Sequence, residues 1–134
     1  MTYAELFGRP MVPGTLYALT AIAAWDGALH FKVGATNQPH HTRLGQHKGR
    51  WSQYFRLSPL TSFPDPDAWR KERFVHMRLA PYRTRDPNDP GNNRVNWEFY
   101  RLEPEQGLRR LRDILAEYDR LLAERPEQGK LFAA

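Results

Sequence analysis

The sequence contains no cysteine, which excludes disulfide bridges and thiolate metal sites. No apolar run approaches the roughly 20 residues that a membrane-spanning helix requires. The N-terminal stretch, MTYAELFGRP, has neither the basic beginning nor the apolar segment of a secretion signal. These absences predict a soluble, cytoplasmic protein.

Apolar side chains are plentiful enough for a folded protein. The chain has 134 residues, of which 40% are hydrophobic and 13% aromatic, and a disordered chain would have fewer of both. A chain of this length buries roughly two-thirds of its unfolded surface, which is enough for one core. Because the sequence also shows no internal repeats, we predict one domain over residues 1–134.

The net charge is positive and comes mostly from arginine. It is +5, from 20 basic and 15 acidic residues, and arginine pairs bidentately with phosphate oxygens. Basic residues concentrate over residues 43–85, as is typical of a surface that follows a nucleic-acid backbone. A GC-rich genome also enriches arginine, so the composition alone does not decide. The candidates for phosphate contacts are Lys48, Arg50, Arg70, Arg73 and Arg83.

The first half of the chain predicts a hairpin, then a helix and a strand. Residues 15–23 and 28–35 favour β-strands, and the turn between them contains the Asp26-Gly27 pair favoured in hairpins. Apolar residues alternate with Lys32 in the second strand, so Lys32 lies on the opposite face from them. Pro39 begins a predicted helix over residues 39–48. The aromatic-rich residues 51–60 are predicted as a third strand.

The second half predicts a helix, a loop and a long amphipathic helix. Asp65 is a suitable N-cap, with Pro66 at the first helical position, for a helix that runs to Leu79. Residues 81–96 are rich in Pro, Asn, Asp and Gly and predict a loop. A short strand candidate follows at 97–102.

From residue 104 to about 125, leucines recur at steps of three and four, which is typical of an amphipathic helix. Such a helix most often docks on its own sheet, and a homodimer seam or a surface for a partner protein is the less favoured use. Together the elements predict an α/β fold: a small antiparallel three-stranded sheet flanked by helices, with a core over residues 14–102 and an extra C-terminal amphipathic helix.

A few polar residues could supply the chemistry of phosphodiester hydrolysis. That reaction needs a base that activates water, positive charge for the developing phosphorane and help for the leaving oxygen. Tyr17 is the candidate base if Lys32 on the facing strand lowers its pKa. Arg43 could clamp the phosphoryl oxygens, and it lies four residues before His47 on the same helical face. Glu72 offers a hard ligand for magnesium.

Each of these residues also has an ordinary structural explanation. A strand tyrosine usually packs, a strand lysine usually faces solvent, and Glu72 can form a salt bridge with His76. A metal cluster of His40, His41 and His47 is a further alternative, but no cysteine and no second set of carboxylates stands at zinc-ligand spacing. The order of the residues along the chain, rather than any one of them, favours the catalytic interpretation.

That order resembles the GIY-YIG nuclease superfamily over roughly residues 14–100. The segment 14–17 (GTLY) stands where the first motif falls, and 32–34 (KVG) stands where the second falls. Thr36 follows shortly afterwards, as in the phage-type branch, and 98–100 (EFY) is similar to the final strand of that branch.

The resemblance implies a role for each matching residue. Tyr17 would be the general base or would position the attacking water. Lys32, standing in place of the second motif's tyrosine, would favour the tyrosinate. Arg43 would stabilise the phosphorane-like transition state, and His47 would lie near the scissile phosphate.

The same resemblance implies that Glu72 holds a single Mg²⁺, or Mn²⁺ in its place. A late asparagine of the family corresponds to Asn96, with Asn92 and Asn93 as rivals. The predicted function is therefore a metal-dependent endonuclease that hydrolyses DNA, and RNA presents the same phosphodiester. Because Lys32 replaces a tyrosine, a catalytically inactive nucleic-acid-binding module of the same fold is the alternative.

Overall fold

The structure is a computed structural model that describes residues 1–51, 53–84 and 99–125. Its elements follow in the order α1 (Tyr3–Phe7), β1 (Gly14–Ala23), β2 (Leu29–Thr36), α2 (His40–Trp51), β3 (Phe55–Asp65), α3 (Ala68–Leu79), the 3-10 helix η1 (Ala80–Tyr82), β4 (Phe99–Tyr100) and α4 (Pro104–Ala123). None of the helices in these ranges combines the length and the apolar character that crossing a membrane requires.

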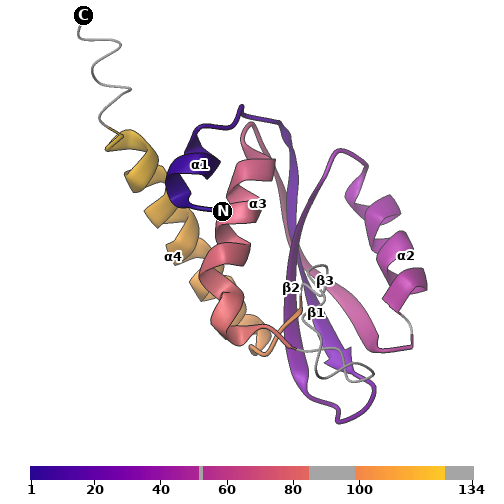
Figure 1. The fold of residues 1–134 in the computed structure, drawn as a ribbon. Coiled ribbons are helices and arrows are strands. Elements are labelled where there is room, and N and C mark those ends of the chain that lie inside the picture. The colour runs from indigo at the N-terminus through magenta and orange to yellow at the C-terminus, as the bar shows by residue number, and fades with distance from the viewer. Residues whose placement is uncertain (52, 85–98, 126–134) are drawn as a thin grey trace, which may run out of the picture.

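The sheet separates two layers of helices (Figure 1). Helix α2 covers one face, and α1, α3 and α4 lie together on the other. Because side chains alternate along a strand, each face has its own core. Phe31 of β2 packs in a cluster with Phe74 of α3 and Tyr118 of α4, whereas Tyr17 of β1 packs in a cluster with Trp51 of α2.

The sheet has four strands rather than the predicted three. Their order is β3-β1-β2-β4, and all pairs are antiparallel. The additional strand, β4, pairs with β2 through Phe31–Tyr100 and Lys32–Phe99. It lies within the short strand candidate at 97–102. A two-residue strand is too short for an alternation pattern to show whether it joins the sheet, which is why the prediction of three strands is wrong.

The predicted hairpin of β1 and β2 is confirmed. Gly27 adopts a φ of 70° in the turn, a conformation that glycine reaches without steric cost. The register pairs Tyr17 with Gly34 and Leu19 with Lys32. Residues paired across two strands share a face, so Tyr17 and Lys32 both lie on the face covered by α2.

Strand β3 begins and ends later in the chain than predicted. The predicted strand covered residues 51–60, but Trp51 ends α2 and β3 runs from Phe55 to Asp65. Aromatic residues favour strands, but Trp51 instead fills the space between α2 and the sheet, where it packs with Phe99. Pro59 and Pro64 are tolerated because β3 is at the edge of the sheet.

Helix α3 begins two residues after the predicted Pro66 and is tied to α4 at its start. Asp67 occupies the N-cap position, and its carboxylate accepts hydrogen bonds from Arg70 and from the hydroxyl of Tyr118 on α4. Burial, together with the Asp67 carboxylate, raises the pKa of Tyr118, which keeps the hydroxyl protonated as a donor. The C-terminal amphipathic helix therefore docks on its own sheet layer.

Candidate functional site

Tyr17 and His47 meet between the sheet and α2. Tyr17 Oη and His47 Nε2 lie 2.5 Å apart, although the two residues are separated by 30 positions in the chain. Both are buried, with exposed fractions of 3% and 4%. A neutral imidazole protonated on Nδ1 accepts this hydrogen bond from the phenol, and an imidazolium donates it to a phenolate. The pair can therefore share one proton in either direction.

Gly34 allows the Tyr17 ring to lie across β2. The two residues are directly opposite each other in the sheet, and a Cβ atom at position 34 would lie only 2.3 Å from Tyr17 Oη. Any larger residue would displace the hydroxyl from His47. The glycine of the KVG triplet is thus required by the packing of Tyr17.

Lys32 lies on the same face of the sheet, two residues before Gly34. It is 3% exposed, and its Nζ lies 5.2 Å from the centroid of the Phe99 ring, a separation at which the ring attracts a cation. Tyr17 and Lys32 are diagonal neighbours in the β1–β2 register, within reach of a long side chain. The site therefore contains a buried lysine on the same face of the sheet as the tyrosine–histidine pair.

Arg43 is one helical turn before His47 on α2. The residue is partly buried, and its Nη1 donates a hydrogen bond to Gln46 Oε1 at 3.0 Å. Its buried Nε has no hydrogen-bond partner among the described residues. The guanidinium therefore keeps N–H groups that could donate hydrogen bonds to a phosphoryl oxygen.

Glu72 belongs to the opposite layer of the molecule. Its Oε1 lies 3.0 Å from His76 Nε2, one turn later on α3, and His76 Nδ1 is hydrogen-bonded to the hydroxyl of Tyr100 on β4. Tyr100 is fully buried, and its ring stacks on the imidazole. The salt bridge with His76 is the ordinary explanation that the sequence offered for Glu72. Within the described residues, the other carboxylate oxygen, Oε2, makes no hydrogen bond.

Helix α3, which carries Glu72, contacts the sheet at two separate places. Its first turn is close to Gly14 at one end of the sheet, and His76 contacts Tyr100, the strand partner of Phe31, nearer the other end. Glu72 stands between these two contacts along the helix.

The predicted phosphate contacts do not share one environment. Lys48, Arg73 and Arg83 are exposed. Arg70 is only 7% exposed; its guanidinium donates hydrogen bonds to the carboxylate at the α3 N-cap and to the backbone carbonyls of Phe7 and Arg9, at and just after the end of α1. Hydrogen bonding to that carboxylate raises the pKa of Arg70. Arg70 therefore has a structural role, and we leave it out of the phosphate-binding set. The side chain of Arg50 lies outside the described part of the structure.

Two further predictions fall wholly or partly outside the described residues. Asn96 and its rivals Asn92 and Asn93 lie outside them. The side chains of His40 and His41, which raised the zinc alternative, are likewise not described. In the parts of the chain that are described, no three histidine, aspartate or glutamate residues gather closely enough to hold a metal ion.

Tyr100 also belongs to this region, although it was not predicted from the sequence as a site residue. It lies 24 positions after its hydrogen-bond partner His76, and no spacing rule relates the two. Their contact depends on β4 pairing with β2. The only sequence signal was the aromatic strand candidate that contains Tyr100.

His30 is a buried histidine on the α2 side that the sequence also passed over. Its Nδ1 is bonded to the Ala28 carbonyl at 3.0 Å, and its Nε2 has no hydrogen-bond partner among the described residues. Desolvation lowers the pKa of His30, assisted by Arg101 and opposed by the Ala28 carbonyl and Asp26. The ring is therefore held neutral over most of the physiological range.

Comparison with known families decides which family this arrangement represents. The family model of the T5orf172 domain matches residues 14–116. The chain belongs to the T5orf172 domain family. No curated protein and no solved structure is significantly similar to the chain.

The T5orf172 assignment corrects the predicted membership of the GIY-YIG superfamily. T5orf172 is a different family, although it is structurally related to some GIY-YIG and HNH-like endonucleases. Short motifs such as GTLY and KVG reflect local strand chemistry and close packing, which unrelated or distantly related families can share. Membership of the T5orf172 family points to a role connected with nucleic acid.

Proposed function

We propose that this T5orf172 domain is a metal-dependent endonuclease that hydrolyses phosphodiester bonds in DNA. The observation that carries the proposal is the 2.5 Å hydrogen bond between Tyr17 Oη and His47 Nε2. A buried phenol on an imidazole is a pair through which a proton can move, which is what activation of a water molecule requires. The family assignment supports the nucleic-acid substrate.

In this proposal Tyr17 takes the proton of the attacking water. The water oxygen bonds to phosphorus, the bond from phosphorus to the leaving oxygen breaks, and the proton passes to the Tyr17 oxygen, which shares it with His47. A neighbouring ammonium favours the phenolate form that acts as a base. Lys32, buried on the same face of the sheet, is suited to that role.

Arg43 is proposed to stabilise the negative charge that develops on the phosphoryl oxygens. It comes from the same helix as His47, and its Nε is buried without a hydrogen-bond partner among the described residues. A donor that is already dehydrated and held in place loses little on meeting the transition state. This supports a direct contact between Arg43 and the scissile phosphate.

Glu72 would hold Mg²⁺, or Mn²⁺ in its place. Magnesium in proteins is commonly bound by one or two carboxylates together with water and substrate phosphate, so the single carboxylate of Glu72 fits such an ion. His76 fixes the Oε1 atom at 3.0 Å, leaving Oε2 for the ligand. When bound, the ion supplies positive charge that polarises a phosphoryl oxygen.

The alternative function is a module that binds nucleic acid without cutting it. The salt bridge between Glu72 and His76, and the position of Glu72 on the layer opposite Tyr17, favour this alternative. In that case Tyr17 and His47 would serve only to pack α2 on the sheet. The two functions differ in their dependence on metal.

Cleavage of supercoiled plasmid DNA in Mg²⁺ and in EDTA tests the proposal. We expect the wild-type protein to cut in Mg²⁺ and not in EDTA. Glu72→Gln should lower the rate about 100-fold or more, because several kcal/mol of charge stabilisation are lost and each 1.36 kcal/mol is tenfold. Glu117→Gln is the matched control, since Glu117 is also a helical carboxylate in an ion pair, with Arg78.

Equal activity of wild type and Glu72→Gln at every metal concentration would show that the proposed metal site is wrong. Absence of cleavage by the wild-type protein, with binding that is the same in Mg²⁺ and EDTA, would favour the binding module instead. The same assay on an RNA of matched sequence shows which of the two nucleic acids is the substrate.

A further inference from the structure

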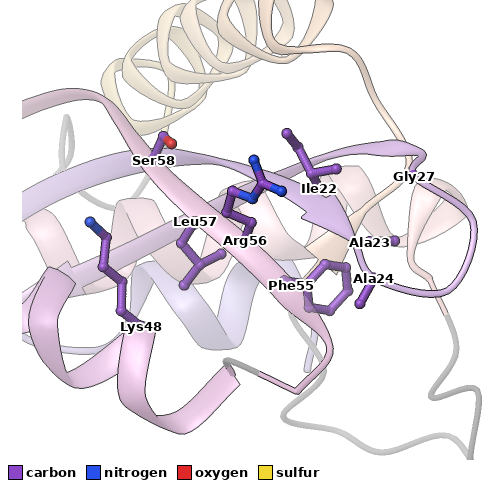
Figure 2. Close-up of a pocket in the computed structure, with 9 residues that line it drawn as sticks. All are labelled: Ile22, Ala23, Ala24, Gly27, Lys48, Phe55, Arg56, Leu57 and Ser58. Atoms are coloured by element: carbon purple, nitrogen blue, oxygen red, sulfur yellow. The ribbon is translucent and has the colours of Figure 1, made fainter.

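A pocket of about 800 Å³ lies between α2, the β1–β2 turn and the beginning of β3. Figure 2 shows its lining, which includes Lys48 on α2, Arg56 on β3 and the apolar residues Ile22, Phe55 and Leu57. The two cations come from different elements and lie on either side of Leu57 in this view. Among the described residues that line the pocket there is no carboxylate.

Neither cation of the pocket is neutralised by the described part of the protein. Lys48 and Arg56 are both exposed, and neither makes an ion pair with a described carboxylate. On the other layer the pattern is different, since Lys71, Arg78 and Arg120 each pair with a carboxylate. Cations that are already paired compete poorly for phosphate, whereas the cations of the pocket are available to it.

The surroundings of the pocket strengthen this contrast. Residues 27–64, which form β2, α2 and nearly all of β3, contain no aspartate or glutamate. Five basic residues lie in the same segment: Lys32, Arg43, Lys48, Arg50 and Arg56. A concave surface with one sign of charge and low-dielectric walls concentrates ligands of the opposite sign.

The floor of the pocket is rigid and apolar. Phe55 is 3% exposed and stacks on Phe99, with ring centroids 3.9 Å apart. Leu57 belongs to the same buried cluster. Arg56 lies between these two residues on β3, so its side chain leaves the strand on the face away from α2.

We propose that this pocket binds the phosphate backbone of the nucleic-acid strand, with Lys48 and Arg56 contacting two phosphates on either side of the edge strand β3. Lys48 directly follows His47 on α2, so the pocket begins one residue from the tyrosine–histidine pair and would hold the substrate beside it. The inference rests on the proposed function for its substrate class. It adds a binding site, and Arg56, to the residues that the sequence indicated.

Binding of a fluorescein-labelled DNA duplex, measured by anisotropy in EDTA at several salt concentrations, tests the pocket without cleavage. In the double variant Lys48→Gln/Arg56→Gln we expect Kd to rise about 10- to 100-fold, as charge-assisted hydrogen bonds are lost. The slope of log K against log salt should fall by about 2, at about 0.9 for each phosphate contact. Both side chains are exposed, so the fold should persist, which thermal melting checks.

Arg9→Gln/Arg109→Gln is the matched control, because it removes the same charge from exposed residues of the layer opposite α2. If both double variants weaken binding equally, the pocket proposal is overturned and only net charge matters. If the wild-type protein never cleaves DNA but the pocket variant binds it more weakly, the pocket proposal stands and the proposed hydrolysis is wrong. If the wild-type protein cleaves DNA but the pocket variant binds it as tightly as the wild type, hydrolysis stands and the pocket proposal is wrong.

Discussion

Each face of the sheet carries a buried tyrosine hydrogen-bonded to a histidine, and the two pairs differ in what surrounds them. On the α2 side Tyr17 meets His47, with the ammonium of Lys32 on the same face. On the α3 side Tyr100 meets His76, whose other ring nitrogen contacts Glu72. The residues of the first pair come from β1 and from the acid-free segment 27–64, whereas on the second side described cations pair with carboxylates.

The difference shows how the same two residue types acquire different properties. A carboxylate on one nitrogen and a phenol on the other fix the ring of His76 in one orientation, which suits a residue that positions Glu72. In the proposed function, Lys32 on the face of Tyr17 would instead favour the phenolate. We therefore expect chemistry to depend strongly on the α2-side pair, and the α3-side pair to contribute mainly to stability and to the orientation of Glu72.

Removal of one hydroxyl from each pair tests this difference and should give the largest effect. Tyr17→Phe should lower the rate of plasmid cleavage by about 10²- to 10⁴-fold, the range for loss of general base catalysis. Tyr100→Phe should lower it by less than about tenfold while costing about 1–3 kcal/mol of stability, because His76 Nδ1 loses a buried partner. Cleavage rates and urea unfolding of both variants measure the two effects.

If Tyr100→Phe impairs cleavage as much as Tyr17→Phe at equal stability, the two pairs act as one unit and the comparison fails. A Tyr17→Phe protein with wild-type activity would show that His47 and Tyr17 only pack α2 on the sheet.

Two glycines on the α2 side sharpen the comparison at the level of packing. Gly34→Ala would bring a Cβ atom 2.3 Å from Tyr17 Oη, and overpacking of this kind costs about 1–3 kcal/mol. Gly45→Ala on α2 meets no atom within 4 Å and should stabilise the helix by about 0.5–1 kcal/mol. Urea unfolding should therefore give opposite signs. Equal effects of the two substitutions would mean that the Tyr17 ring can move away without cost.

The smallest expected effect concerns His30 and the pH dependence of stability. Because burial lowers the pKa of His30 in the folded state, the unfolded state binds more protons as the pH falls through the ordinary histidine range. This contribution to stability is complete above that range and is lost on acidification. The urea midpoint of the wild type should thus fall more between about pH 8 and about pH 5 than that of His30→Asn. If the urea midpoints of the wild type and of His30→Asn change with pH in parallel, His30 is not a buried neutral ring.

Local signals in the sequence were sufficient for the elements whose structure depends on nearby residues. The Asp26-Gly27 turn and the alternation around Lys32 predicted the hairpin, and leucine spacing predicted α4, since turn chemistry and periodicity act over a few residues. The boundaries of α2 and β3 were wrong because the aromatic Trp51 packs equally well from a helix. β4 was not counted because its two residues become a strand only through pairing with β2.

For the candidate site as well, the sequence predicted which residues take part but not their long-range contacts. Tyr17, Lys32, Arg43, His47 and Glu72 were all selected from the sequence, but of their contacts only the salt bridge between Glu72 and His76 was predicted. His47 could be placed on a helical face with Arg43, but its bond with Tyr17 spans 30 positions. Arg70 was selected as a surface cation because its neighbours in sequence are basic, and its burial depends on Asp67 and on carbonyls more than 60 positions away.

The sequence by itself determined the hairpin, the helical periodicities, the acid-free basic segment and the identity of the polar residues, because these follow from local sterics, hydrophobic spacing and charge. The tertiary structure alone decided that Tyr17 meets His47, that His76 meets Tyr100, and that Lys48 and Arg56 line one pocket. These outcomes arise when strands and helices distant in sequence pack together, and only then does each side chain acquire its burial, its partners and its charge state.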